Sequence, residues 1–236
     1  MARYFYGCDE VTRGWESYFD LCNAVELDLS KFDEPPKIET LNGWRVDSPK
    51  NFCFILHLEP QIRRYLGKGD ELVPDSREEY PDVVEEAWQT TLERASALAA
   101  RALLVSTGES FSPGETNRKR MRAFVEHFAG ETDAPLLWEP SGLWNVEDTC
   151  EFADEAGLVP VYDPFVAQRE GFEFTHGDVG FVITERPGMR RQFDVFDFKE
   201  LMRWTDNYDR VFSMLRGRHK WAHAQQFQIA IRQAAL

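Results

Sequence analysis

Eight short apolar runs alternate along the chain with segments of helical character, and this alternation constrains the fold more than any other feature. Runs of this kind suit strands that are buried on both faces, as in a parallel sheet. Strand and helix alternating about eight times is the pattern of a barrel. We therefore predict an α/β fold, a single (β/α)8 TIM-type barrel, with an open doubly wound sheet as the alternative. The predicted strands are residues 3–7, 24–28, 52–58, 102–107, 135–139, 158–163, 180–184 and 210–215.

Helical signals fill most of the gaps between these runs. The clearest predicted helix covers residues 81–102 and carries Pro81 in its first turn. Two others cover residues 113–128 and 146–157, and a last helix begins near Trp221. Neither GxGxxG nor GxxxxGK[ST] is present to support nucleotide binding on a doubly wound sheet. No low-complexity linker interrupts the chain, so we predict one domain over residues 1–236.

The composition suits a folded protein of the cytoplasm. Apolar residues make up 43% of the chain and aromatic residues 14%, which is enough for a sizeable core. No apolar run approaches the ~18 residues that span a bilayer, and the N-terminus has no apolar stretch typical of a signal peptide. The cysteines are widely spaced and form no CxxC pair, so we interpret them as buried free thiols in a reducing cytoplasm. They are Cys8, Cys22, Cys53 and Cys150.

The charge is strongly acidic but uneven. A formal net charge of -14 argues against a nucleic-acid partner, because contact with many phosphates needs clustered Lys and Arg. Residues 186–220 nevertheless hold many arginines, in RPGMRR and LRGRHK. This local basic sector favours a small anionic molecule as the partner, and we expect neither a membrane nor a long nucleic acid.

Polar residues end several of the predicted strands. Glu139 and Asp163 each close an apolar run and precede a proline, Glu26 and Asp28 lie two residues apart, and His57 lies near the end of its run. The carboxyl ends of barrel strands form the mouth where chemistry takes place. We therefore predict catalytic roles for Glu26, His57, Glu139 and Asp163.

Three chemistries stay open for this cluster. Carboxylates with an imidazole are able to hold a divalent metal, so a metal cofactor is possible. The same groups also suit an acid and a base with separated pKa values. Alternatively, Glu139 and Asp163 cap the following helices or pair with buried arginines. His219 and His223 have the i, i+4 spacing of some zinc sites, but we favour a solvated helix face for them.

A second group of residues is predicted to bind the ligand. Arginines after the last two strands lie where barrels commonly bind phosphate, and their forked guanidinium groups suit phosphate or carboxylate. Ordinary pairing with some of the chain's 41 acidic residues is the alternative. The arginines are Arg186, Arg190, Arg191, Arg216 and Arg218, and the predicted ligand-binding set is Arg216, Arg186, Ser141, Asn117 and Asp28.

Several segments match a known family pattern. The chain has YFYG followed by Trp15, then an acid-led stretch from Glu26. STGESFSPGETN, WEPSGLW and YDPF follow in the same order as in that pattern, and the last two are its most specific part. In these segments the chain resembles the YecE-like domain-of-unknown-function family 72 over almost its whole length. The resemblance implies a barrel of this size and no established reaction.

The departures from the family pattern fall where polar function is expected. Where the family pattern has an arginine, this chain has Ser141, and where it has a lysine, this chain has His57. Arg216 takes the place of an asparagine of the pattern, and His223 takes the place of an acid. We predict an uncharacterised barrel that binds a small anionic ligand at its C-terminal mouth, with catalysis left open. One alternative is a metal-assisted or acid/base hydrolase of a small phosphorylated or carboxylated substrate. Another is a catalytically degenerate barrel that serves as a protein-interaction module.

Overall fold

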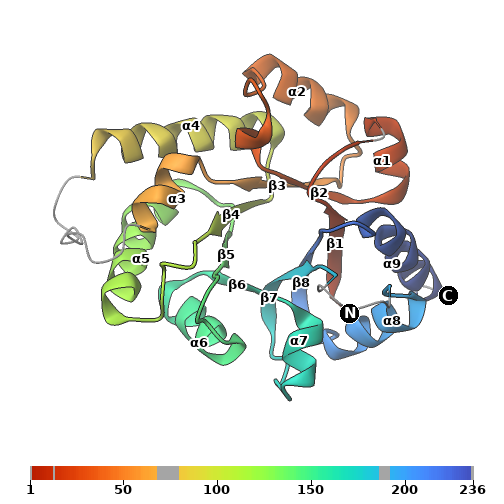
Figure 1. Cartoon of the computed structure of the whole chain (residues 1–236). Helices are drawn as coiled ribbons and strands as arrows, with labels where there is room; N and C mark the ends of the chain where they lie inside the picture. Colours follow the sequence, from red (N-terminus) through yellow and green to blue (C-terminus); the bar gives the residue numbers. More distant parts are fainter. Residues whose placement is uncertain (1, 13, 68–79, 186–191, 235–236) are drawn as a thin grey trace. The chain divides into compact units, whose positions relative to one another are not determined.

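The computed structural model describes residues 2–12, 14–67, 80–185 and 192–234. Within these residues, eight parallel strands in one sheet alternate with helices (Figure 1), which is the predicted (β/α)8 TIM-type barrel. All eight predicted strands are confirmed, with their ends shifted by a few residues. They are β1 Arg3–Cys8, β2 Ala24–Leu27, β3 Cys53–His57, β4 Ala102–Ser106, β5 Leu136–Glu139, β6 Val159–Tyr162, β7 Gly177–Ile183 and β8 Tyr208–Leu215.

Three of the helices begin at residues whose side chains cap them. Asn145 caps α6, Asp163 caps α7 with Pro164 at its first position, and Asp194 opens α8 with a capping box. The helices are α1 Trp15–Leu21, α2 Ile38–Asp47, α3 Pro60–Leu66, α4 Asp82–Leu98, α5 Glu115–Phe128, α6 Val146–Ala156, α7 Pro164–Arg169, α8 Val195–Trp204 and α9 Lys220–Ala234. Two short 3-10 helices are η1 Leu29–Lys31 and η2 Ala129–Glu131.

The sheet register brings the two most specific sequence segments onto neighbouring strands. The strand order is β1-β8-β7-β6-β5-β4-β3-β2, and β5 pairs in parallel with β6, with Leu137 opposite Val159. Glu139 is the last residue of β5, and Asp163 directly follows β6. Each acid therefore lies at the carboxyl end of its own strand, as predicted.

The chain groups into two compact units. The first unit comprises Met1–Glu26, Ser48–Cys53 and Tyr162–Leu236, and the second comprises Leu27–Asp47 and Phe54–Val161. Both units contain buried apolar residues. A single domain over residues 1–236 stays a prediction.

The second unit has an aromatic interior. Trp88 of α4 lies with its ring centroid 5.8 Å from Phe124 and 5.1 Å from Phe128, both of α5. Trp138 of β5 packs edge-on against Phe152 of α6 at 5.2 Å. These rings are fully buried and fix the helices to the strands, because aromatic rings contribute the largest buried areas in a core.

In the first unit, Asn23 joins three strands at the start of β2. Its side-chain Oδ1 accepts from Tyr6 N at 2.7 Å, and its Nδ2 donates to Tyr4 O at 2.8 Å. Its backbone N–H also donates to Tyr6 O, and its carbonyl accepts from Cys53 N at the start of β3. One residue therefore satisfies backbone groups of β1 and β3 while β2 begins.

Gly7 and Tyr18 complete the contact between β1 and β2. A Cβ at Gly7 would lie 1.8 Å from the carbonyl oxygen of Ala24, so only glycine permits this approach. The buried Tyr18 hydroxyl accepts from Cys8 N at 2.7 Å and donates to Ala24 O at 2.9 Å. Burial raises the pKa of Tyr18 well above its usual value, so the phenol stays protonated and able to donate.

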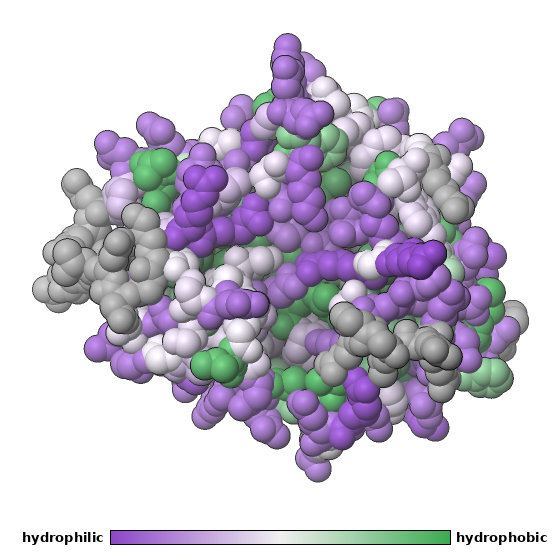
Figure 2. All heavy atoms as spheres, in the orientation of Figure 1, coloured by the Kyte–Doolittle hydropathy of each residue, from purple (hydrophilic) through white to green (hydrophobic). Residues whose placement is uncertain are grey.

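Hydrophilic residues cover most of the face seen in Figure 2, and hydrophobic residues show there as small patches. All four cysteines have free thiols, as predicted. Cys8, Cys22 and Cys53 are buried, whereas Cys150 is half-buried, so the predicted burial is wrong for Cys150. In the described part of the chain, no helix is both long enough and apolar enough to cross a membrane.

We expect Asn23→Ala to lower the free energy of unfolding by about 2–4 kcal/mol, because it leaves Tyr6 N–H and Tyr4 C=O without a partner. Urea unfolding measures the change. Asn207→Ala, at an exposed position of the same unit, is the control and should stay within about 0.5 kcal/mol of wild type. Equal losses in the two variants would contradict the assigned role of Asn23.

Candidate functional site

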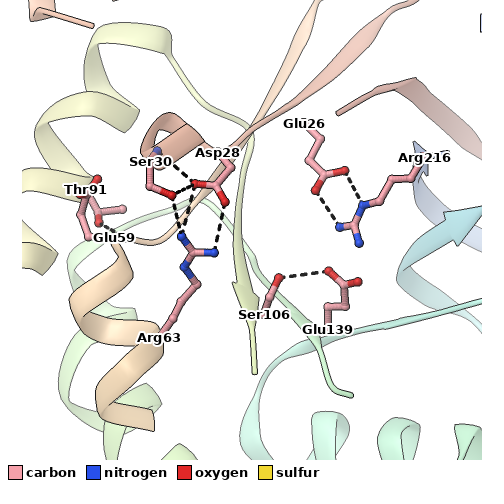
Figure 3. Close-up of polar contacts among 9 residues, drawn as sticks. All are labelled: Glu26, Asp28, Ser30, Glu59, Arg63, Thr91, Ser106, Glu139 and Arg216. Atoms are coloured by element: carbon pink, nitrogen blue, oxygen red, sulfur yellow. Dashed lines mark hydrogen bonds and ion pairs between the residues drawn. The ribbon is translucent and has the colours of Figure 1, made fainter. Parts of the chain in front are cut away.

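The first unit contains a buried ion pair at the carboxyl ends of its strands (Figure 3). Glu26 lies in β2, where every side chain is buried, and Arg216 directly follows β8. Arg216 Nε and Nη2 donate to the two carboxylate oxygens of Glu26 at 2.9 and 2.7 Å. The Glu26 side chain is 2% exposed and that of Arg216 is 23% exposed. The guanidinium is therefore the partner that faces solvent, and the carboxylate holds it in place.

The second unit has a similar arrangement around Asp28 (Figure 3). The Asp28 carboxylate caps η1 by accepting from Ser30 N at 3.1 Å, and it also accepts from Ser30 Oγ. Arg63 of α3 donates to both carboxylate oxygens, at 3.2 and 3.3 Å. The Asp28 side chain is 8% exposed and that of Arg63 is 22% exposed, so the cation again faces solvent.

These contacts set the ionisation of Asp28. Burial alone raises the pKa of Asp28, but hydrogen bonds from Ser30 and the positive fields of His57 and Arg63 outweigh it. The pKa of Asp28 therefore lies below its usual value. The carboxylate stays charged near neutral pH, which suits an orienting partner for Arg63 better than a general base.

Two further predicted residues lie at strand ends of the second unit. Glu139 lies opposite Ser106 in the parallel pair of β5 with β4, and Ser106 Oγ donates to Glu139 Oε2 at 3.1 Å. His57 is the last residue of β3 and is buried. Its field acts on Asp28, so the structure brings these two predicted residues within electrostatic reach.

Ser141 connects the loops that follow β4 and β5. Its Oγ donates to Thr107 O at 2.7 Å. Trp144 Nε1 donates to Phe111 O at 2.6 Å, which ties the same two loops together. Gly142 has a φ of +78°, and a Cβ there would lie 2.9 Å from the carbonyl oxygen of Glu109. These contacts give the two loops one fixed arrangement.

Asn117 and Asp163 also make local structural contacts. Asn117 is buried in α5, donates from Nδ2 to Ser112 O at 2.9 Å and accepts from Arg120. Asp163 caps α7 by accepting from Phe165 N and Val166 N at 2.9 and 3.1 Å. Capping was the structural alternative for Asp163. The ligand and catalytic roles of these two residues stay predictions.

The predicted arginines differ in their surroundings. Arg216 pairs with Glu26, whereas Arg218 is exposed in the loop between β8 and α9. Arg186, with Arg190 and Arg191, lies outside the described residues.

The solvated helix face predicted for His219 and His223 is wrong for His223. This side chain is fully buried between α9 and α8, where its ring centroid lies 5.2 Å from that of Phe193. Its Nε2 accepts from Phe193 N at 3.3 Å, and burial lowers its pKa below the usual value. The apolar residues of α8 cover the face of α9 that the sequence alone leaves open to solvent.

Sequence reasoning missed four residues that complete these contacts. Ser30 carries a recognisable signal, since Asp-x-Ser favours a turn in which the aspartate caps the following residues. The others have no local signal, because each meets a partner more than thirty residues away in the chain. They are Arg63, Ser106 and Glu185, whose Oε1 accepts from the backbone N–H of His219 just before α9.

A divalent metal would need a cluster of side chains that can act as its ligands. Among the described residues, His, Cys, Asp and Glu side chains form no group of three or more that could hold a metal ion. Glu26 and Asp28 have arginine partners instead.

We expect Arg63→Gln to cost on the order of 1 kcal/mol of stability near pH 6 and clearly less near pH 3. Because its folded pKa is lowered, Asp28 contributes stability that is present above its unfolded pKa of about 3.9. That contribution is lost as the pH falls through the lower folded value. Urea unfolding of wild type and variant at both pH values measures the difference.

Arg203→Gln, which breaks the exposed Arg203–Glu200 pair, is the matched control. A gap between wild type and Arg63→Gln that stays constant from about pH 6 to about pH 3 would show that Asp28 ionisation is not involved.

Solved structures with this architecture include proteins of one family. A DUF72 family protein from Enterococcus faecalis aligns with a TM-score of 0.70 and 17% identity, covering 98% of both chains. A DUF72 family protein from Thermotoga maritima aligns with a TM-score of 0.64 and 13% identity, covering 98% of this chain and 99% of the other. Endonuclease IV from Thermus thermophilus aligns with a TM-score of 0.54 and 14% identity, covering 99% and 100%.

Sequence comparison adds nothing to these structural matches, since no family model and no curated protein matches the chain. At such low identities the likeness concerns the fold. The chain therefore has the fold that these DUF72 family proteins adopt, a (β/α)8 barrel.

Proposed function

We propose that this chain is a divergent member of the DUF72, or YecE-like, family and binds a small anionic molecule at the carboxyl ends of its strands. The proposal concerns binding, and we assign no reaction. Proteins of similar fold include endonuclease IV and a D-psicose 3-epimerase, whose names denote unrelated chemistries. The fold therefore supports neither a nucleic-acid nor a sugar substrate, and the ligand class has to come from the side chains.

The orientation of two ion pairs carries the proposal. In the pair of Glu26 with Arg216 and in the pair of Asp28 with Arg63, the carboxylate is buried and the guanidinium is partly exposed. A surface pair formed only for solubility has no reason to bury its acid, because burying a carboxylate is costly. A buried carboxylate that holds an arginine in one orientation is what a site for an external anion requires.

The free energy expected from hydrogen bonds between one arginine and an anion corresponds to weak binding of a small molecule. A charge-assisted hydrogen bond contributes about 1.5–3 kcal/mol, so two such bonds from one guanidinium give about 3–6 kcal/mol. A dissociation constant of 1 mM corresponds to about 4 kcal/mol. Binding in the millimolar to high micromolar range is therefore expected for a ligand that contacts one arginine.

Arg216 is our first choice for the anion contact, because its guanidinium is held by two short hydrogen bonds to Glu26. Arg216→Lys keeps the charge and removes the planar fork, so it should weaken binding of a small carboxylate about tenfold or more. Calorimetric titration with acetate, malonate, succinate and inorganic phosphate measures the change. Arg203→Lys, at an exposed position of the same unit, should bind as wild type does.

Arg216→Ala alone is unsuitable for this test. It leaves Glu26 buried without its arginine, a change that costs about 3–5 kcal/mol. The double variant Glu26→Gln/Arg216→Gln removes both charges and should also lose binding. If wild type binds none of the anions at about 10 mM, or if both Arg216 variants bind as wild type does, the proposal fails.

A further inference from the structure

The loop between β8 and α9 is basic, and the chain's own acids neutralise most of it. Arg216 pairs with Glu26, and Lys220 Nζ donates to Asp9 Oδ1 at 2.7 Å and to Glu10 Oε1 at 2.5 Å. All these residues belong to the first unit. The positive charge that the sequence shows here is therefore largely paired inside the protein.

The side-chain carboxylate of Glu185 binds the backbone N–H at the start of α9. It follows β7, and its Oε1 accepts from His219 N at 2.6 Å. His219 precedes the helix, and its carbonyl accepts from His223 N at 2.9 Å, so it is the residue that opens α9. In a capping box a side chain three residues into the helix satisfies this N–H, but Ala222 has no group to do so. A carboxylate from another strand end takes that place.

The surrounding contacts hold Glu185 there. Arg216 N donates to Ile183 O at 3.0 Å, which fixes the end of β8 against the end of β7. Gly217 has a φ of +90°, and a Cβ there would lie 3.2 Å from Thr184 Oγ1. The imidazole of His219 lies 3.6 Å from Glu185 Oε2 and contacts Gln192 through its Nδ1 at 2.9 Å. The carboxylate is therefore part of a fixed arrangement of these loops.

This position is the one where many barrels bind phosphate. In (β/α)8 barrels, the loops after strands seven and eight and a nearby helix N-terminus commonly supply the phosphate-binding N–H groups. We propose that Glu185 is a specificity-determining residue that acts as an internal anion and excludes phosphorylated ligands from the start of α9. The inference rests on the proposed function and narrows it, since the ligand then carries a carboxylate bound at Arg216.

Two effects would disfavour phosphate at the start of α9: the charge of Glu185 and the engagement of the His219 N–H. A phosphate dianion at this position would lie beside the Glu185 carboxylate and would repel it. The backbone N–H of His219 already donates to Glu185 Oε1, so this N–H would not be available to the phosphate. A carboxylate ligand carries a single charge, so Glu185 repels it less than it repels a phosphate dianion.

The test removes only the charge of Glu185. Glu185→Gln keeps the shape and an oxygen that accepts from His219 N, so the loops should keep their arrangement. We expect Glu185→Gln to bind inorganic phosphate about tenfold tighter than wild type at constant ionic strength, by calorimetry. Glu200→Gln makes the same charge change at an exposed position of α8 and should leave phosphate binding unchanged. Equal phosphate affinity in Glu185→Gln and wild type would overturn the inference.

A second measurement needs no variant. The backbone amide resonance of His219 in wild type should not move when inorganic phosphate is added to about 10 mM, because Glu185 occupies that N–H. A shift of this resonance in wild type overturns the inference even if Glu185→Gln does not fold. The proposed function is judged separately, by the Arg216-dependent binding of carboxylates to wild type. If wild type binds no carboxylate but Glu185→Gln binds phosphate more tightly than wild type does, the proposed carboxylate ligand is rejected. The role of Glu185 in excluding phosphate then stands.

Discussion

The contact between β1 and β2 is the constraint on which the first unit depends. Gly7 lets the backbone of β2 come so close that a Cβ would overlap the carbonyl of Ala24. Asn23 then uses its side-chain amide as a substitute for backbone partners on β1, while its own carbonyl bonds the start of β3. Because β2 is fixed in this way, Glu26 is carried into a fully buried position, where a charged group is stable only with a partner. Arg216 supplies that partner.

In this chain of net charge -14, several acids bind the protein's own arginines and a backbone N–H group. Glu26 and Asp28 are buried and bind Arg216 and Arg63, and Glu185 accepts from the backbone N–H of His219. Net charge alone describes solubility and long-range steering. In the proposed ligand site, the more exposed member of each ion pair is the arginine, which is the group that would contact an anion.

The segments that match the family pattern serve mainly to hold loops in place. Ser141 and Trp144 of WEPSGLW bond to carbonyls of STGESFSPGETN, Asn117 of the latter bonds within its own segment, and Asp163 of YDPF caps a helix. Such contacts set the geometry of the loops and carry no information about a reaction. This accounts for a resemblance that predicted the barrel and gave no reaction.

The sequence by itself determined the eight strands, the capped helices, the order of elements and the placement of Glu139 and Asp163 at strand ends. These features depend on periodicity, caps and prolines, which act between residues close in the chain. Only the tertiary structure decided the partners. Glu26 and Arg216 are 190 residues apart in the chain, and no local pattern relates them. The burial of His223 likewise required α8 to cover its face of α9. The ends of distant strands meet through the packing of the whole sheet, so their side-chain pairs are set by the fold and carry no signature of their own in the sequence.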